Sequence, residues 1–411
     1  MVYSFKTLGD FDVAGKRVLV RVDINSPLER TTLKVKDRSK IASAVPTLKE
    51  LSDKGAKVAV LAHQGKKDHW EYTDLHEHAE ILSVLLHRNV RYVDDLLGSV
   101  SKKAIESLKD GEIILLKNVR SYGEEDHRLS PEHHAEGTLV KHLAPLFDLF
   151  VNDAFASAHR QHASLLGFTV VLPSAAGRLM ENEIKSLSKI VESPKRPCVV
   201  VFGGTKFADS IHIVNHLLEA GIADNIVIGG LVGLAYSAAD GKHIGDENMK
   251  TLAHELSPEH IANAKGILSR FGSKITLPVD LALDKDGKRL EVALDHNPPA
   301  LHSLDIGSKT IGKFGEILSH AKTILISGPV GVFEKDEFAV GTRAIFEMSV
   351  SSGAFCIIGG GHTTAAANQM GFSDRISYIS TGGGALEHFL LGKPMASIEA
   401  LNHAALRKTA V

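Results

Sequence analysis

Cysteine, tryptophan and long hydrophobic runs are scarce in this sequence. Only Cys198 and Cys356 occur among 411 residues, both in apolar stretches. A disulfide framework is therefore excluded, and two buried thiols in a reducing compartment are expected. Glycines interrupt the apolar runs well before the ~20 residues that a membrane span needs. Since the first residues also lack the pattern of a signal peptide, the sequence predicts a cytoplasmic protein without a membrane anchor.

The sequence also has no excess of charge of either sign. Its 47 Lys and Arg residues against 49 Asp and Glu residues give a net charge of −2. We therefore expect neither nucleic acid nor an acidic membrane as a partner, and any basic site must be local. With 44% hydrophobic and 23% charged residues, the composition is that of a globular protein. A chain of this length usually forms two domains, because one core rarely grows past about 250–300 residues.

Short β-branched runs alternate with amphipathic, helix-length stretches along both halves. Runs without polar alternation are typical of parallel strands covered on both faces. The sequence thus predicts an α/β fold of two doubly wound, Rossmann-like parallel-sheet domains, joined by a long helix and with the active site in the cleft between them. The predicted strands are 17–22, 57–62, 90–93, 112–116, 149–151 and 167–171 in the first half, and 198–202, 225–228, 274–277, 323–326, 355–358 and 376–379 in the second.

The domain boundary is predicted near Leu172–Ala176. Residues 1–174 would form the N-terminal domain and 175–395 the C-terminal domain. Arg178–Val191 reads as one long polar helix that could connect them. The tail, 396–411, forms another amphipathic pattern and is expected to pack back on the first domain.

Glycine-rich turns follow several predicted strands of the second half. In an open parallel sheet, ligands bind at the carboxyl ends of the strands, where glycine lets backbone N–H groups approach phosphate. Together the turns predict a nucleotide diphosphate or triphosphate site. It is of neither common type: Phe314 stands where a Walker A loop needs Ser or Thr, and Thr364 where G-x-G-x-x-G needs its third glycine. The Gly307–Lys313 stretch, with no strand predicted before it, is taken as coincidence. The turns are at Gly203-Gly204, Gly229-Gly230, Gly328–Gly331, Gly359–Gly361 and Gly382–Gly384.

Basic residues follow the predicted strands of the first half. A core has no use for such a cluster, since unpaired buried charge is costly. A small anion with carboxylate and phosphate groups would satisfy it, because arginine donates in a bidentate fork. Transfer of a phosphoryl group from the nucleotide to this anion is the simplest interpretation, with domain closure excluding water. The segments are Arg21–Asn25, Asp37-Arg38, His63–Lys66, Asn118–Arg120 and Asn152–Arg160.

Nine motifs in this order resemble the phosphoglycerate kinase family, from about Phe11 to Leu390. The resemblance implies a two-lobed kinase of glycolysis and gluconeogenesis, which moves a phosphoryl group reversibly between ATP and 3-phosphoglycerate, giving ADP and 1,3-bisphosphoglycerate. The first lobe would bind 3-phosphoglycerate and the second the nucleotide, with Mg²⁺ held mainly by the nucleotide phosphates. The motifs are RVDINSP, DRSKIASAVPTL, LAHQGK, LLKNVR, VNDAFASAHR, GGTKFADSI, SGPVGVFE, IGGGHTTAA and STGGGA.

The resemblance also implies roles for single residues, carried over by motif. The catalytic set would be Arg38, Lys206, Gly360 and Gly383. The 3-phosphoglycerate set would be Asp23, Ile24, Asn25, Arg38, His63, Gln64, Gly65, Lys66, Arg120 and Arg160. The nucleotide set would be Gly203, Gly204, Lys206, Gly229, Gly230, Gly328, Glu334, Gly360, Gly361, His362 and Thr363. The acceptor carboxylate is already ionised at pH 7, so the reaction needs positioning and positive charge rather than a general base. No protein metal ligand is predicted.

Three positions depart from the family pattern. Lys66 replaces an arginine, Ser210 a second lysine, and His362 an aspartate that helps to hold Mg-nucleotide. The last two resemble the archaeal branch, which would allow a homodimer as well as a monomer. Two alternatives are an NAD-dependent oxidoreductase, disfavoured by the missing fingerprint, and a non-catalytic binding module. The 22 histidines include no H-E-x-x-H zinc motif.

Overall fold

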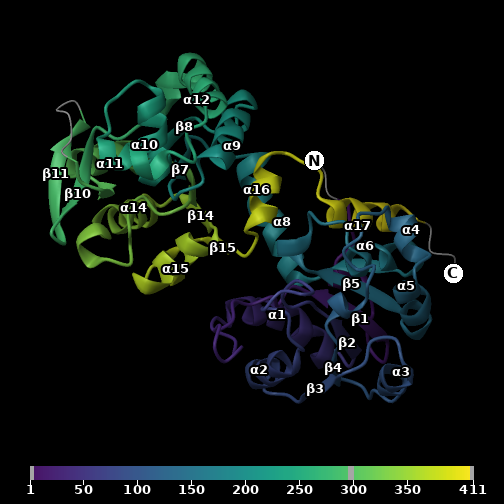
Figure 1. Ribbon diagram of the computed structural model, residues 1–411. Helices are drawn as coiled ribbons and strands as arrows, with labels where there is room; N and C mark the ends of the chain where they lie inside the picture. The colour runs from purple at the N-terminus through teal and green to yellow at the C-terminus, as the bar shows by residue number, and fades with distance from the viewer. Residues whose placement is uncertain (1–3, 295–299, 408–411) are drawn as a thin grey trace. The chain divides into compact units, whose positions relative to one another are not determined.

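The computed structural model describes residues 4–294 and 300–407. The chain divides into two compact units: unit 1 is Met1–Lys185 with Lys393–Val411, and unit 2 is Ser186–Gly392. Each unit has its own parallel sheet with helices around it (Figure 1). The two parallel-sheet α/β domains expected from the sequence are confirmed.

The unit 1 sheet contains six parallel strands in the order β3-β4-β2-β1-β5-β6. Alternate residues of β1 enter two different apolar clusters, Val18 and Val20 one of them and Leu19 the other, so helices cover both faces. This explains why the strands read as unbroken apolar runs. The strands are β1 (Arg17–Val22), β2 (Lys57–Leu61), β3 (Val90–Val93), β4 (Ile113–Leu116), β5 (Leu149–Asp153) and β6 (Ser174–Ala176).

The helices of unit 1 connect these strands and add a segment from the end of the chain. Helix α17 contacts α6, α7 and β6, beside which it lies in Figure 1. The helices are α1 (Ser39–Asp53), α2 (His76–Leu86), α3 (Ser99–Glu106), α4 (Pro131–Ala135), α5 (Thr138–Leu143), α6 (Ala163–Leu166), α7 (Phe168–Val171) and α17 (Ala396–Leu406), with 3-10 turns η1 (Leu8–Asp10), η2 (Val119–Ser121), η3 (Ala144–Leu146) and η4 (Phe155–Ser157).

The unit 2 sheet also contains six parallel strands, in the order β15-β14-β13-β7-β8-β9. Its strands are β7 (Cys198–Phe202), β8 (Asn225–Ile228), β9 (Ile275–Thr276), β13 (Thr323–Ser327), β14 (Phe355–Gly359) and β15 (Tyr378–Ser380). Its helices are α9 (Phe207–Glu219), α10 (Gly230–Ala239), α11 (Asp246–Leu252), α12 (Pro258–Phe271), α13 (Ser308–Ser319), α14 (Val340–Ser351), α15 (Gly361–Gln369) and α16 (Gly384–Leu390), with 3-10 turns η5 (Gly272–Lys274), η7 (Asp336–Phe338) and η8 (Ser373–Arg375).

A second sheet in unit 2 is absent from the sequence prediction. It is antiparallel, in the order β11-β10-β12, and comprises β10 (Asp280–Lys285), β11 (Lys288–Ala293) and β12 (Ser303–Ile306). The β10–β11 hairpin turns at Asp286 and Gly287, whose φ angles are 55° and 79°. Two successive positive φ values are typical of a type I′ turn, which favours the sequence Asp-Gly. This pair could therefore have indicated a β-hairpin, but the prediction did not use it.

This small sheet also corrects the interpretation of the Gly307–Lys313 stretch. A strand, β12, does precede it, and α13 begins within it, at Ser308. The start of α13 is occupied by protein, because the Asp280 carboxylate accepts hydrogen bonds from the backbone N–H groups of Lys309 (2.9 Å) and Thr310 (2.8 Å). A carboxylate already caps this helix, so the stretch is no phosphate loop, although for a different reason than the one predicted.

The strand predicted at 167–171 is wrong. Phe168–Val171 forms α7, and the sixth strand is β6, a short run of small residues three positions later. The β-branched residues of this segment favour a strand locally, but packing decides otherwise: α7 lies against α4, α6 and α17. The tertiary contacts override the local preference.

Helix α8 (Arg178–Val191) begins in unit 1 and ends in unit 2, with the bounds predicted for it. Its first turn is tied to two other elements of unit 1. The Arg178 N–H donates to Thr47 Oγ1 (2.8 Å) of α1, and its guanidinium donates to both carboxylate oxygens of Glu50 (2.6 and 2.8 Å). The buried Asp153 carboxylate, at the end of β5, accepts from the Met180 N–H (3.1 Å). The connection between the units therefore starts from a well-anchored helix end.

Asp153 predicts a pH dependence of stability. Burial raises the pKa of this carboxyl from its ordinary 3.8 to about 7. Between these values the folded protein keeps a proton that the unfolded chain has lost, so raising the pH through this window weakens folding. Asp153→Asn keeps the acceptor oxygen but cannot titrate, so its free energy of unfolding should decline from pH 5 to pH 8 by about 2–3 kcal/mol less than that of the wild type. Denaturant unfolding at several pH values measures this.

Asp148→Asn is the matched control. Asp148 is exposed and lies just before β5, and its carboxylate accepts from the Arg17 N–H (2.8 Å). That variant should follow the wild-type decline. Parallel pH curves for Asp153→Asn and the wild type would show that Asp153 does not hold the extra proton.

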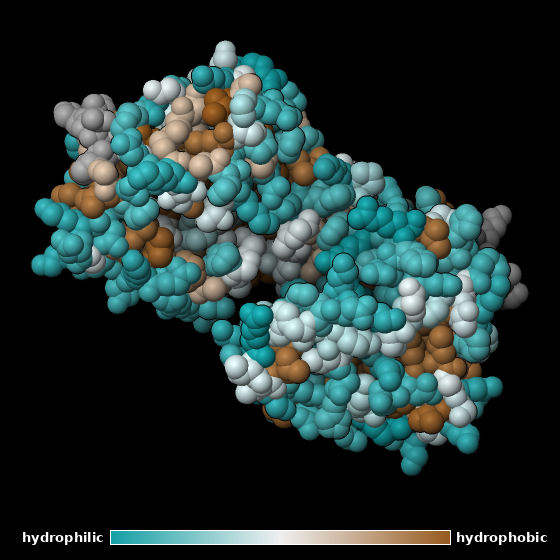
Figure 2. All heavy atoms as spheres, in the orientation of Figure 1, coloured by the Kyte–Doolittle hydropathy of each residue, from teal (hydrophilic) through white to brown (hydrophobic). Residues whose placement is uncertain are grey.

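The surface seen in Figure 2 is mostly hydrophilic on each unit, with separate small hydrophobic patches. Within residues 4–294 and 300–407, no helix combines the length and apolar character needed to cross a bilayer.

Candidate active site

The strand order of unit 1 collects the predicted anion-binding segments. Strands β4, β2, β1 and β5 are consecutive neighbours in the sheet and parallel, so the residues that follow them meet at one edge. Asp23 follows β1 there and is buried. Its carboxylate accepts from Ser157 Oγ (2.6 Å) and lies 3.5 Å from Lys40 Nζ. Burial alone would raise the pKa of Asp23, but Lys40 and the Ser157 hydroxyl lower it far below its ordinary value. Asp23 is thus a fixed anion.

Arg21 and His63 form the buried centre of this edge. Arg21 is fully buried and donates to Ser164 Oγ (2.8 Å), to the Val22 carbonyl oxygen and to His63 Nδ1 (3.1 Å). Burial, with arginines nearby, holds the pKa of His63 well below its ordinary value. His63 is therefore a neutral imidazole in a cationic surrounding.

Amide groups organise the loops that follow β1 and β2. Asn25 Oδ1 accepts from the Gly65 N–H (2.9 Å), and the Arg120 guanidinium donates to the Gly65 carbonyl oxygen. Gln64 is fully engaged: its Oε1 accepts from the Ser26 N–H (2.9 Å) and its Nε2 donates to the Ser26 carbonyl oxygen (3.0 Å). The Gln64 side chain therefore serves the loop structure, and its backbone carbonyl oxygen accepts from Asn118 Nδ2 (2.8 Å).

The remaining predicted residues of unit 1 differ in exposure. Arg38, the residue before the first turn of α1, and Lys66 are exposed, while Arg120 and Arg160 are half-buried. Ile24 is fully buried, so it is a core residue by its side chain. The exposed and half-buried cations are the ones available to a ligand.

Sequence reasoning missed a buried group behind this edge. Glu125 is buried and accepts from Ser164 Oγ (2.6 Å) and from the Ser164 N–H (2.9 Å). Burial raises the pKa of Glu125 to about 7, against the opposing attraction of Arg21. Nothing in the spacing of Glu125 and Ser164 identifies them, because they are brought to Arg21 only by the tertiary fold.

In unit 2 the glycine turns line a pocket of about 250 Å³. The turns after β7 and β13 pack directly together: the Gly204 N–H donates to the Pro329 carbonyl oxygen (2.7 Å), and a Cβ on Gly203 would lie 2.2 Å from that same oxygen. Only glycine fits there. The Thr363 hydroxyl is buried and accepts from the Gly328 N–H (2.8 Å), so its side chain shapes the turn.

Lys206 provides the cation of this pocket and is 70% exposed. Its Nζ lies 3.7 Å from both Asp209 Oδ2 and Glu387 Oε1, which also line the pocket. An ammonium so exposed between two carboxylates is held only weakly and can turn toward a bound anion.

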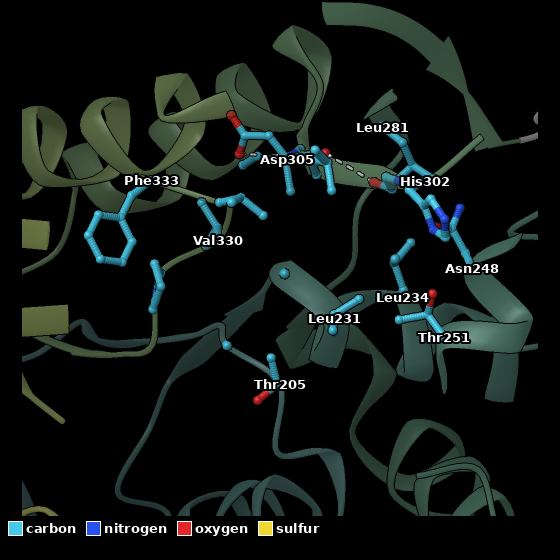
Figure 3. A pocket seen from close by; sticks show the side chains of 18 of the residues that line it. Thr205, Leu231, Leu234, Asn248, Thr251, Leu281, His302, Asp305, Val330 and Phe333 are labelled. Atoms are coloured by element: carbon cyan, nitrogen blue, oxygen red, sulfur yellow. Dashed lines mark hydrogen bonds between the residues drawn. The ribbon is translucent and has the colours of Figure 1, made fainter. Parts of the chain in front are cut away.

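A second pocket of about 300 Å³ adjoins the first, since Gly204, Thr205, Pro329 and His362 line both. Figure 3 shows its walls: Leu231 and Leu234 come from α10, Asn248 and Thr251 from α11, and Val330 and Phe333 from the segment after β13. Such apolar walls suit a flat heterocycle.

The residues predicted to bind the nucleotide, together with Gly383 of the predicted catalytic set, are distributed over these two pockets, apart from Gly229. Gly203, Gly204, Lys206, Gly328, Gly360, Gly361, His362, Thr363 and Gly383 line the smaller pocket, and Gly204, Gly230, Glu334 and His362 line the larger one. Gly229 lines neither; it precedes α10, and a Cβ there would lie 2.8 Å from the Val330 side chain. Packing against Val330 therefore requires glycine at position 229.

Two parallel-sheet units, one with a cationic strand edge and one with glycine turns at a pocket, define a kinase of small molecules. The family model of phosphoglycerate kinase matches residues 8–393. The phosphoglycerate kinase of Methanothermus fervidus is 44% identical over 406 residues, covering 99% of each chain. The structure is similar to those of phosphoglycerate kinases from Pyrococcus horikoshii (TM-score 0.89, 37% identity, 97% of this chain and 99% of that one) and Coxiella burnetii (TM-score 0.83, 30% identity, 98% and 100%). The chain belongs to the phosphoglycerate kinase family.

Enzymes of this family transfer a phosphoryl group between ATP and the carboxyl group of 3-phosphoglycerate, a step of glycolysis. Curated relatives at 39–44% identity include archaeal phosphoglycerate kinases, in line with the departures at Ser210 and His362. The predicted family and activity are thereby confirmed. An oxidoreductase and a non-catalytic module are set aside.

Proposed function

We propose that unit 1 binds 3-phosphoglycerate at the carboxyl edge of its sheet. The convergence of His63, Arg120 and Arg160, which follow neighbouring strands and affect one another's charge, carries this proposal, with Arg38 added at the start of α1. A ligand with one carboxylate and one phosphate suits several separate cations better than a single one. Asp23 and Asn25 complete the site: the first orients Lys40, and the second fixes the loop that holds Gly65 and Lys66.

Unit 2 would hold the nucleotide across its two adjoining pockets. The base fits between the apolar walls of the larger pocket, where Glu334 can accept from ribose hydroxyls. The phosphates then lie in the smaller pocket, at the start of α15. Gly360, which precedes that helix with φ of 92°, leaves the first N–H groups pointing outward for an anion.

In the transfer step, the carboxylate of 3-phosphoglycerate attacks the terminal phosphorus of ATP, and the bond from that phosphorus to the ADP oxygen breaks. Positive charge on the moving group lowers the barrier. Arg38 and Lys206 would supply the charge, and backbone N–H groups near Gly360 and Gly383 would donate to its oxygens. No proton needs to be removed from the nucleophile.

Magnesium would enter with the nucleotide, held mainly by its phosphates. Mg²⁺ commonly takes one or two carboxylates in addition to phosphate and water, and Asp209 and Glu387 are carboxylates lining the phosphate pocket. When bound, the metal neutralises phosphate charge.

We also propose a cytoplasmic protein, since Cys198 and Cys356 are buried and burial raises the pKa of each thiol to about 12. A monomer and a homodimer both remain predictions.

His362 carries a prediction about the metal. It lines both pockets at the start of α15, and imidazole is a poor ligand for Mg²⁺. We expect its ring to donate to a nucleotide phosphate. His362→Asp should then lower the Mg²⁺ concentration for half activity about threefold and weaken metal-free ADP binding by a similar factor, because like charges repel. Metal titrations of activity and calorimetry with ADP measure the two effects.

His320→Asp, at an exposed histidine after α13, adds the same charge elsewhere in unit 2 and should change neither quantity. If His362→Asp also changes neither, the histidine only forms part of the helix start, and its phosphate role is rejected.

The proposed function is tested by assay of the purified protein. ATP and 3-phosphoglycerate together, with Mg²⁺, should give ADP at a rate on the order of 10–10³ per second. ADP release that does not depend on 3-phosphoglycerate would contradict it.

A further inference from the structure

A chain of hydrogen bonds links a buried carboxylate to the anion site of unit 1. Glu125 Oε1 accepts from Ser164 Oγ (2.6 Å), and Ser164 Oγ accepts from Arg21 Nε (2.8 Å). Another Arg21 nitrogen, Nη2, lies 3.1 Å from His63 Nδ1. Each of the four side chains is at most 2% exposed. The chain is therefore shielded from water along its whole length.

The direction of each hydrogen bond follows from the groups themselves. A guanidinium can only donate, so His63 Nδ1 must accept from Arg21 and cannot carry a proton. Because Ser164 Oγ accepts from Arg21 Nε, its own hydrogen is free for Glu125. A neutral imidazole with an unprotonated Nδ1 carries its proton on Nε2. Arg21 thus sets one tautomer of His63, and Ser164, held by Glu125, keeps Arg21 in place for this.

Burial and the neighbouring arginines favour the same state, against the attraction of the Asp23 carboxylate. The histidine is surrounded by Arg21, Arg120, Arg160 and Asp23, and burial together with these arginines keeps it neutral. Glu125 faces Arg21, Arg120 and His162, whose Nδ1 is 3.8 Å away. Glu125 and Asp23 balance the charge of the buried Arg21.

We propose that Glu125 and Ser164 are positioning residues which, through Arg21, hold His63 in the Nε2–H tautomer and so fix it as a hydrogen-bond donor. The benefit to substrate rests on the proposed role of His63 in binding 3-phosphoglycerate: an Nε2–H group donates to an anion, whereas an unprotonated Nε2 would repel it. No proton moves during the reaction. Glu125 and Ser164 act only by fixing the position of Arg21 and the proton on His63.

The tautomer is read directly by ¹⁵N NMR of histidine-labelled protein without substrate, because the protonated and unprotonated ring nitrogens resonate far apart. The His63 signals are assigned as those missing from His63→Gln. The proposal expects an unprotonated Nδ1 and a protonated Nε2. A protonated Nδ1, or averaging between both tautomers, overturns it.

Ser164→Ala tests the link, since it removes one hydroxyl and leaves the Glu125 side chain in place. Averaging of the His63 tautomers is expected, together with a rise of about fivefold in KM for 3-phosphoglycerate, an unchanged KM for ATP and kcat within twofold. The matched control is Ser174→Ala, which should resemble the wild type. Ser174 is another buried serine of unit 1, and its hydroxyl donates to the Leu172 carbonyl oxygen (3.0 Å).

Glu125→Gln keeps an oxygen that accepts from Ser164, so it should retain the tautomer and a KM within twofold of the wild type. Loss of the tautomer in this variant would overturn the geometric role in favour of charge alone. An unchanged tautomer in Ser164→Ala would overturn the link. An averaged tautomer with unchanged KM would support the link but contradict the proposed role of His63 toward substrate. If Ser164→Ala fails to fold, the wild-type spectrum and Glu125→Gln still decide.

Discussion

Arg38→Ala is expected to lower kcat by about 10³-fold, as loss of a transition-state cation does in other phosphoryl transfers. Arg38 precedes the first turn of α1 and is exposed, so its side chain is available to the moving group rather than to the core. Steady-state kinetics with both substrates saturating measures the effect. Circular dichroism should be unchanged, because the side chain is not part of the packing.

The matched control is Arg91→Ala, at an exposed arginine on β3. It removes the same charge from unit 1 and should leave kcat within twofold. A normal kcat in Arg38→Ala, with only a raised KM for 3-phosphoglycerate, would restrict Arg38 to ground-state binding and reject its catalytic role.

Lys206→Ala should lower kcat by about 10²-fold or more, the typical effect of removing one preorganised donor. Its ammonium has two weak carboxylate contacts at 3.7 Å, and Ser210 supplies no second cation where relatives often have lysine. We therefore expect no other side-chain ammonium to take its place in this pocket. The same kinetic assay in both reaction directions, with calorimetry for ADP, separates the catalytic loss from weaker binding.

Lys265→Ala, at an exposed lysine of α12, is the control for unit 2 and should behave as the wild type. Lys206→Arg should recover part of the activity, because charge is restored with altered reach. A Lys206→Ala enzyme with kcat near normal would show that the backbone N–H groups of the glycine turns provide the stabilisation alone.

The fold could be predicted where local and tertiary preferences agree. The apolar runs at Arg17–Val22 and Cys198–Phe202 became central strands with the predicted bounds, because strands covered on both faces need continuous apolar sequence. The prediction failed at Phe168–Val171, where β-branched residues became a helix under tertiary packing. It also missed the hairpin that turns at Asp286-Gly287. Charged residues interrupt the apolar residues of its strands, so these strands do not have the continuous apolar sequence of buried parallel strands.

The candidate site was predictable for a related reason. Parallel strands bring their carboxyl ends to one edge, so residues after β1, β2 and β4 had to meet once those strands were recognised. Groups that support the site from behind could not be found in this way. Glu125 and Ser164 follow no strand end, and their importance comes from the hydrogen bonds that connect Glu125 through Ser164 to Arg21. Likewise, spacing alone could not show that the Gln64 and Thr363 side chains are engaged within loops.

The division of ligands between the units is tested most directly by hydrogen–deuterium exchange of backbone amides with each ligand alone. 3-Phosphoglycerate should slow exchange in residues 23–25, 63–66 and 118–120 of unit 1. ADP with Mg²⁺ should slow exchange in residues 203–206, 328–334 and 360–363 of unit 2. The opposite pattern, or protection of unit 2 turns by 3-phosphoglycerate with none at the unit 1 strand ends, would contradict the account.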